Sequence, residues 1–342
     1  MDVSVIIPFC NEGQNVVFTA QSLIEELDGF CKYEIILVDN QSDWHIDCSV
    51  KNEKMPLMNG QERPYTIRSR AFFQGPPGSK NDGSTIGTMF FRKGVIKYVQ
   101  YDDKQGHWNA KNKGIEVSSG QYLLFLDAHC IMSRDSVRKM VEFLRHPPEE
   151  KIGGVHAYIN YMLDSRSLEY RPQKDKFFGY QFCTHQYTKG GHKRTEPYKV
   201  CVMSTCAMMC PRTVIDELGG WHPEFGIYCG GEGYMNFKQS TCGYHHWIHP
   251  ECVCWHWAEK RGYQYWHKDF VRNEFIAAYV CGGERALQFC IEGRGNKPVH
   301  HELADDVKEK CKAEREFIKS RQVETLEEYF DRWTANPGIW ER

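Results

Sequence analysis

The first forty residues alternate between apolar runs and a helical repeat. Val3 to Pro8 and Tyr33 to Val38 are mostly apolar, which is typical of strands that are buried on both faces of a parallel sheet. Between them, from Asn15 to Leu27, apolar residues recur at the spacing of one helix face. Strand, helix and strand in this order predict a βαβ unit with a right-handed crossover.

The same alternation continues to residue 161. It predicts strands at 96–101, 121–126 and 154–161 and helices at 109–117 and 135–144. We therefore expect an α/β, Rossmann-like fold in which helices flank a mostly parallel central sheet. From Asp269 onward the apolar spacing is helical, with segments expected near 269–281, 284–292 and 303–321. We predict an α/β domain over residues 1–265 and a helical C-terminal extension over residues 266–342.

Two stretches depart from this alternation and are rich in Lys and Arg. Residues 59–98 hold seven basic residues against two acidic ones, with aromatic residues between them, and residues 165–199 repeat the bias. We treat about 44–98 as a basic insertion in the α/β domain. Such a segment can follow a phosphate backbone and stack an extruded base, or it can simply be a solvated surface.

Composition indicates a globular protein in a reducing compartment. The chain has 342 residues, 41% of them hydrophobic, and a formal net charge of -2, so no global positive field favours a polyanionic partner. No apolar run approaches the roughly 20 residues of a membrane span, and the N-terminus has no signal pattern. The fifteen cysteines are an odd number at core-like positions, which favours free thiols. We expect a cytoplasmic protein with no membrane partner.

The segment from Tyr122 to His129 carries the first candidate chemistry. Its apolar run ends in Asp127 and His129, two residues apart at the predicted carboxyl end of a strand. Ligands bind beyond this edge of open α/β sheets, and an acid and an imidazole there can hold one divalent cation. The alternative is an ordinary strand-end turn with a surface histidine.

Several motifs occur in an order that resembles a known family. They are Val5-Ile6-Ile7-Pro8-Phe9-Cys10-Asn11-Glu12, Ile36-Leu37-Val38-Asp39-Asn40-Gln41-Ser42-Asp43, Asn109-Ala110-Lys111-Asn112-Lys113-Gly114 and Phe125-Leu126-Asp127-Ala128-His129. In this order they resemble the nucleotide-sugar glycosyltransferases of the GT-A fold. Tyr228-Cys229-Gly230-Gly231-Glu232, followed by Pro250 and His256, is most similar to the polypeptide N-acetylgalactosaminyltransferases, whose metal motif is also Asp-x-His.

The resemblance implies a metal-dependent glycosyltransferase with a UDP-sugar donor. It implies that Asp127, His129 and His256 bind Mn²⁺ or Mg²⁺, and a mixed carboxylate and imidazole set suits Mn²⁺ better. The residues expected around the donor are Pro8, Asn11, Glu12, Asp39, Gly106, Asn112, Gly230 and Gly231. Asp39 is placed to accept from the ring N–H of the base, or else it caps the segment that follows it.

Glu232 is the second catalytic candidate beside Asp127, and the resemblance implies that it contacts the donor sugar. Related inverting enzymes have an aspartate base directly after this glutamate, whereas this chain has Gly233. We therefore expect a retaining reaction in which the departing phosphate takes the acceptor proton. The alternative is that Glu232 itself takes that proton.

The acceptor is a hydroxyl group whose carrier the sequence leaves open. The two basic stretches favour a hydroxymethylated pyrimidine in DNA, while the family resemblance favours Ser or Thr of a protein, or a glycan. The third alternative is a protein of a different functional class, which binds a sugar nucleotide without catalysis or is a structural protein stabilised by zinc. For zinc, the cysteines and histidines between Cys242 and His256 offer many ligands, without a clean paired spacing.

Overall fold

The computed structural model describes residues 1–42, 93–162, 194–257 and 266–335, and between them the backbone of five short strands. Its strands are β1 Val3–Phe9, β2 Tyr33–Asp39, β3 Lys54–Pro56, β4 Glu62–Pro64, β5 Thr85–Phe90, β6 Gly94–Gln100, β7 Tyr122–Phe125, β8 Cys130–Met132, β9 Ile152–Tyr161, β10 Arg166–Glu169, β11 Gln186–Lys189, β12 Tyr198–Val200, β13 Met208–Pro211 and β14 His245–His256. Its helices are α1 Asn15–Leu27, α2 His107–Val117, α3 Ser136–Arg145, α5 Arg212–Leu218, α6 Gly231–Thr241, α7 His267–Gly293, α8 Pro298–Lys319 and α9 Leu326–Ala335. Most of the two basic stretches, including most of the predicted insertion at 44–98, lies outside the described residues.

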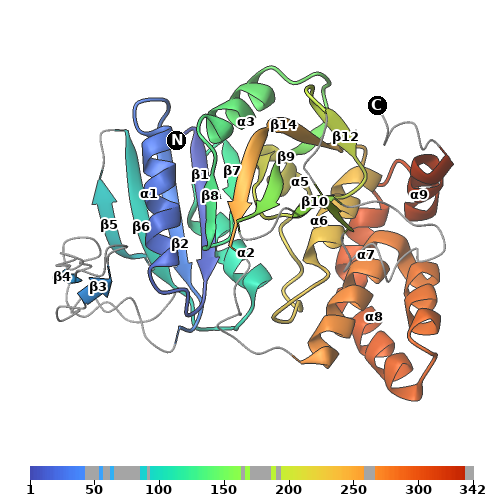
Figure 1. Ribbon diagram of the computed structural model, residues 1–342. Helices are drawn as coiled ribbons and strands as arrows, with labels where there is room; N and C mark the ends of the chain where they lie inside the picture. The colour runs from blue at the N-terminus through green and yellow to red at the C-terminus, as the bar shows by residue number, and fades with distance from the viewer. Residues whose placement is uncertain are drawn as a thin grey trace.

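One large sheet organises the molecule (Figure 1). Its main strand order is β11-β10-β9-β13-β7-β1-β2-β6-β5; off this path, β14 pairs with β9, and β12 and β8 pair with β14. The four strands β7, β1, β2 and β6 are parallel neighbours, whereas β13 and β5 flank them in the antiparallel direction. The α/β prediction is therefore confirmed, and the parallel part of the sheet is its centre.

The predicted βαβ unit forms as expected. Every residue of β1 and of β2 is buried, because both faces of the central sheet are covered. Helix α1 has the predicted bounds and buries the stripe Val16, Ala20, Leu23 and Leu27. The structure thus places the carboxyl ends of β1, β2 and β7 side by side at one edge, where the motifs of the first half meet.

Helices α7 and α8 lie at the lower right of Figure 1 and α9 lies above them at the right, with α7 and α9 in contact with α6. The break predicted near residue 282 lies inside α7, where Gly283 has a non-helical, positive φ of 74°. Buried residues of α7, α8 and α9 belong to the same apolar core as those of the sheet. A domain boundary at 265/266 stays a prediction. Among the described helices, none combines the length and the apolar character that crossing a bilayer requires.

Candidate active site

Asp127, His129 and His256 come together beyond the end of β7. Asp127 and His129 lie in the turn between β7 and β8, and His256 is the last residue of β14. The Nε2 atoms of His129 and His256 are 3.2 Å apart, and His256 Nε2 is 3.7 Å from Asp127 Oδ2. Two imidazole nitrogens that bind one ion at right angles, each about 2.1 Å from it, are about 3 Å apart. The two imidazole nitrogens thus have a spacing that suits a common ion, and Asp127 lies next to His256. Among the described groups of three possible ligands within 4.8 Å of one another, Asp127 and His256 are joined by Cys206 rather than by His129.

Two buried polar atoms in this cluster have no partner among the described residues. They are Asp127 Oδ1 and His256 Nδ1. A buried carboxylate oxygen without a hydrogen bond is costly, and a cation or a ligand group would satisfy it. One carboxylate and two imidazoles form a donor set that fits Mn²⁺ better than Mg²⁺, which prefers oxygen ligands. The residues present therefore fit the predicted metal, and their ligand role stays a prediction.

Glu12 orients His129. The Nδ1 atom of His129 lies 3.0 Å from Glu12 Oε1, so Nδ1–H donates to the carboxylate and Nε2 is left facing His256. Burial alone would lower the pKa of His129, but this hydrogen bond and the charges of Glu12 and Asp127 raise it to about 9. A histidine that binds metal through one nitrogen commonly donates to a carboxylate through the other. Glu12 contacts a predicted metal ligand, and its predicted contact with the donor stays a prediction.

Asp127 is held in its charged form. Burial would raise the pKa of this carboxyl, but a hydrogen bond with His256 and the nearby charge of Lys111 lower it well below its usual range. Asp127 also keeps about a fifth of its side chain exposed, at 22%. It is therefore available as an anionic group at neutral pH.

Lys111 is a buried cation that the sequence reasoning did not single out. The side chain is fully buried, and its Nζ lies 3.2 Å from Thr205 Oγ1. The ammonium also lies over the rings of Trp108 and Trp221, at 5.1 and 5.4 Å from their centroids. Lys111 follows Trp108 by three residues and so falls on the buried face of α2. The sequence signal that could have revealed Lys111 is its position on the helix face that buries Trp108.

Glu232 lies in the first turn of α6, where the helix dipole favours a carboxylate. Burial raises its pKa to about 7, and the charge of Lys111 opposes this while that of Asp127 adds to it. The two catalytic candidates are therefore electrostatic neighbours, with Lys111 acting on both. A carboxyl with a pKa near neutrality can accept or release a proton under ordinary conditions.

The glycines before Glu232 are required by packing. Gly230 has a φ of 78°, a left-handed conformation that suits glycine. A Cβ on Gly231 would lie 2.4 Å from the Trp108 ring. In the structure Gly231 brings α6 close to α2, whereas Gly230 lies against Asn273 of α7. The predicted contact of these glycines with the donor stays a prediction.

We expect Gly231→Ala to destabilise the protein by about 1–3 kcal/mol, the usual range for overpacking a core. Trp108 cannot easily move away, because it is buried and stacks on Trp221 with ring centroids 5.5 Å apart. Chemical unfolding checks the value. Gly293→Ala is the matched control, since a Cβ there would meet nothing within 4 Å. Equal stability of the two variants would contradict this packing argument.

The predicted nucleoside-binding residues lie at the ends of β1 and β2. Pro8 pairs with Val38 in the central sheet. Asn11 has a φ of 57°, and its backbone N–H donates to Ser42 Oγ at 3.0 Å. Asp39 is buried, accepts from the Tyr98 hydroxyl, and also accepts from the Ser42 N–H at 3.2 Å. The capping alternative for Asp39 is therefore realised, and its contact with a base stays a prediction.

Gly106 and Asn112 have clear structural partners. The N–H of Gly106 donates to Asn40 Oδ1 at 2.7 Å, which fixes the start of α2 next to the end of β2. The side-chain amide of Asn112 donates to the Trp221 carbonyl at 2.6 Å and accepts from the Trp221 N–H at 2.9 Å. Asn112 thus anchors the segment that leads to α6, and its predicted donor contact stays a prediction.

The C-terminal helices hold α6 in place. Lys238 of α6 is fully buried, donates to the Gly219 carbonyl at 3.0 Å and lies 3.4 Å from Glu314 of α8. Tyr234 of α6 also donates its hydroxyl to Glu314. The extension, which showed no catalytic cluster in the sequence, therefore supports the helix that carries Glu232.

The cysteines and histidines between Cys242 and His256 do not gather around one ion. Alternation along β14 sends neighbouring side chains to opposite faces. His246 pairs with His156 at 3.1 Å, and Cys252 Sγ contacts the Ser136 carbonyl at 3.3 Å. Among the described residues, only Cys254 and His256 of this run join groups of three possible ligands, and they join different groups. The zinc site considered within this run is therefore not formed.

Comparison with known proteins identifies what the chain resembles. Residues 80–219 match the model described as "Glycosyl transferase family 2", a segment that contains Asp127 and His129. Polypeptide N-acetylgalactosaminyltransferase 5 of Caenorhabditis elegans is 24% identical over 252 residues, which is 70% of this chain and 34% of that protein. N-acetylgalactosaminyltransferase 7 of Drosophila melanogaster is 24% identical over 254 residues, 70% of this chain and 36% of that protein. The chain spans about a third of the length of these curated relatives.

A solved structure shares the fold. The crystal structure of GalNAc-T7 with UDP, GalNAc and Mn²⁺ superimposes with a TM-score of 0.65 at 14% identity, covering 98% of this chain and 57% of that chain. The expected GT-A fold is thereby confirmed, and the chain is similar to polypeptide N-acetylgalactosaminyltransferases, as the sequence motifs suggested.

Proposed function

We propose that this chain, a GT-A-fold relative of the polypeptide N-acetylgalactosaminyltransferases, is a metal-dependent glycosyltransferase that moves a sugar from a UDP-sugar to a hydroxyl acceptor. The observation that carries the proposal is the meeting of Asp127, His129 and His256 at the edge where β7 ends, with two buried polar atoms unsatisfied. Relatives named for transfer of N-acetylgalactosamine, and a structural neighbour solved with UDP and Mn²⁺, support the same donor chemistry.

Asp127, His129 and His256 would hold Mn²⁺. A bound Mn²⁺ ion would offset the negative charge that grows on the diphosphate as the glycosidic bond breaks. Glu12 supports the site by fixing the His129 ring with Nε2 directed toward His256. Lys111 adds a fixed positive charge behind Asp127 and Glu232, within an aromatic setting that excludes water.

We propose that the reaction retains the configuration of the sugar. The bond from C1 to the phosphate oxygen breaks, the acceptor oxygen bonds to C1 on the same face, and the acceptor proton passes to the departing phosphate. Gly233 leaves no carboxylate directly after Glu232. Glu232 is then free to accept hydrogen bonds from the hydroxyls of the donor sugar, and its raised pKa makes this role dependent on pH.

We also propose which molecule bears the acceptor hydroxyl. Hydroxymethylated pyrimidine in DNA is favoured by the basic stretches 59–98 and 165–199 of the sequence, and Ser or Thr of a protein by the names of the relatives. We also propose a reducing, cytoplasmic location, supported by the thirteen described cysteines, none of which is in a disulfide.

A donor-hydrolysis screen tests the function. UDP-sugars are incubated with the full chain and Mn²⁺, and we expect released UDP for one sugar and none after chelation by EDTA. A hydroxymethylated duplex and a Ser/Thr peptide are then added separately, and the acceptor should raise UDP release. Binding to DNA should weaken steeply with salt, whereas binding to a peptide should not. If UDP binds but is released from no donor, the non-catalytic sugar-nucleotide-binding alternative is favoured; if UDP neither binds nor is released from any donor, the proposal fails.

A further inference from the structure

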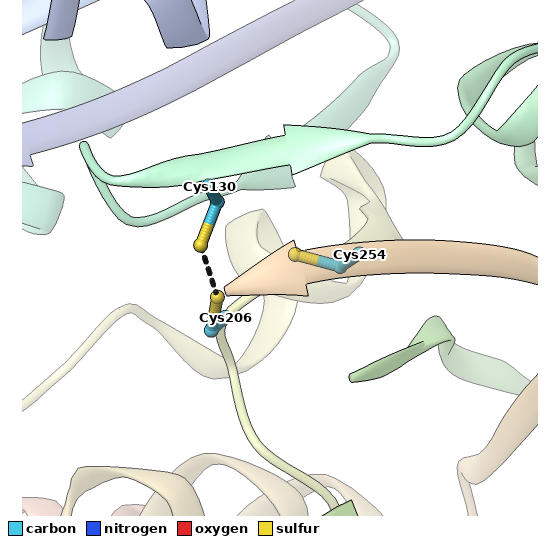
Figure 2. A group of neighbouring side chains, drawn as sticks. All are labelled: Cys130, Cys206 and Cys254. Carbon is cyan, nitrogen blue, oxygen red and sulfur yellow. Dashed lines mark hydrogen bonds between the residues drawn. The ribbon is translucent and has the colours of Figure 1, made fainter. Parts of the chain in front are cut away.

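Three cysteines from three separate segments converge (Figure 2), and one of them, Cys206, lies close to Asp127 and His256 of the candidate active site. Cys130 lies on β8, Cys254 on β14, and Cys206 in the segment that precedes β13. The Sγ atoms of Cys130 and Cys206 are 3.5 Å apart, and all three Sγ atoms lie within 4.8 Å of one another. Each of the three side chains is buried, with at most 5% exposed.

The backbone explains why the thiols meet. Strands β8 and β14 are antiparallel neighbours, in which Cys130 is opposite His256 and Cys254 is opposite Met132. Residues two apart on a strand point to the same face, so Cys254 and His256 share the face on which Cys130 lies. The Cys206 N–H donates to Ser204 Oγ at 3.1 Å within this third segment, and the next residue, Ala207, ties the segment to the sheet by accepting from the Ala157 N–H of β9 at 3.0 Å.

We propose that Cys130, Cys206 and Cys254 form a binding site for a thiophilic metal ion, with Zn²⁺ as the ion to test. Three thiolates that bind one ion at about 2.3 Å in tetrahedral directions are about 3.8 Å apart. The observed separations need only small side-chain movements to reach that arrangement. Soft sulfur ligands select Zn²⁺ or Cu⁺ over Mn²⁺ and Mg²⁺, so this site differs in chemistry from the one formed by Asp127, His129 and His256.

Asp127 and His256 border the three thiols, and either could supply a fourth ligand. Cys206 Sγ also lies within 4.8 Å of ligand atoms of Asp127 and His256. Those two side chains are partly exposed, at 22% and 18%, so an ion can reach the thiols from the candidate active site. Because His256 faces both groups, a thiophilic ion that recruits it would weaken binding of Mn²⁺ next to it.

Metal binding by the full chain, kept reduced with a phosphine, tests the proposal. Titration with Co²⁺ alone should produce thiolate-to-metal charge-transfer bands and the strong visible bands of a tetrahedral ion, and Zn²⁺ should then remove both. We expect the charge-transfer bands to stop increasing once one equivalent of Co²⁺ per chain has been added. Zinc-edge X-ray absorption needs no variant and should count three sulfur neighbours at about 2.3 Å.

Matched variants separate this site from its surroundings. Cys254→Ser and Cys206→Ser should each lower the Co²⁺ affinity at least tenfold and remove the charge-transfer bands. Cys252→Ser is the control, because Cys252 is equally buried on the same strand but its Sγ contacts the Ser136 carbonyl. His129→Ala should leave the bands in place while weakening Mn²⁺ binding, since His129 is not part of the thiol group.

Two results would overturn the proposal while leaving the glycosyltransferase proposal intact. One is a wild-type spectrum with only weak octahedral bands and no sulfur neighbour of zinc, which would make the three cysteines ordinary core residues. The other is an equal loss of the bands in Cys252→Ser and Cys254→Ser, which would trace the signal to general loosening of β14. Circular dichroism checks that each serine variant is folded, and the absorption measurement decides the question if one is not.

Discussion

Asp127→Asn is expected to lower the rate of Mn²⁺-dependent donor turnover by about 10³-fold, the scale of losing one group that stabilises transition-state charge. The substitution removes the anionic member of a cluster whose other members are the imidazoles of His129 and His256. It also removes the charge that, with Glu12, keeps the pKa of His129 raised. The Mn²⁺ affinity, followed by electron paramagnetic resonance, should fall together with the rate.

A graded series makes the result specific. Glu12→Gln should weaken Mn²⁺ binding by about 10- to 100-fold, the usual cost of losing a group that orients a metal ligand, because Glu12 orients His129 without reaching His256. Asp216→Asn on the exposed face of α5 is the control and should behave as wild type. Wild-type Mn²⁺ affinity in Asp127→Asn would remove this residue from the metal site.

The sequence predicts correctly those elements that are buried either on both faces, like the central strands, or on one side only, like α1. Strands β1 and β2 are covered on both faces and therefore appear in the sequence as continuous apolar runs. Helix α1 lies on the surface of the sheet, so its apolar residues recur on one side only. Helix α9, which we did not predict, carries the same signal in Leu326, Tyr329, Phe330 and Trp333.

Helix α6 and strand β14 were missed for physical reasons. Ten of the eleven residues of α6 are buried, so no polar side remains to give a helical period, and Gly230 and Gly231 suggest a loop. Burial along β14 does alternate, but its inward positions are occupied largely by histidine and cysteine. These residue types suggested a compact ligand cluster, whereas the strand distributes them over several contacts.

The site was predicted through resemblance more than through pattern. Asp127 and His129 stand out at the end of an apolar run, but nothing in the spacing of the sequence brings His256 to them. That contact depends on how β14 pairs with β8 and β9, including the register shifts along β14 between His245 and His246 and between His249 and Val253. Lys111 was not singled out because its neighbours in the chain are mostly polar, as in an ordinary solvated helix, and Cys206 because it is a single cysteine. Only the tertiary structure shows what each side chain faces.

Glu232→Gln should lower the rate of transfer by about 100-fold, within the range of losing hydrogen bonds to a charged group. The neutral amide can still contact a hydroxyl, so retention of configuration, read by NMR of the product anomer, should not change. The rise in wild-type activity as pH passes through about 7, the pKa of Glu232, should be absent in the variant. Glu309→Gln on the exposed face of α8 is the control. Full activity of Glu232→Gln would exclude this residue from catalysis.

The same substitution should stabilise the metal-free protein above neutral pH. Folding raises the pKa of Glu232 from its ordinary 4.5 to about 7, so the folded state holds a proton that the unfolded state releases between these values. The stabilising contribution is complete below pH 4.5 and is lost as pH rises to about 7. A shift of roughly two and a half pKa units corresponds to about 3 kcal/mol. Urea unfolding in EDTA at pH 5 and pH 8 should therefore show a smaller loss of stability for Glu232→Gln than for wild type. Parallel losses in both proteins would mean that Glu232 is already ionised in the folded state, with its charge satisfied by Lys111.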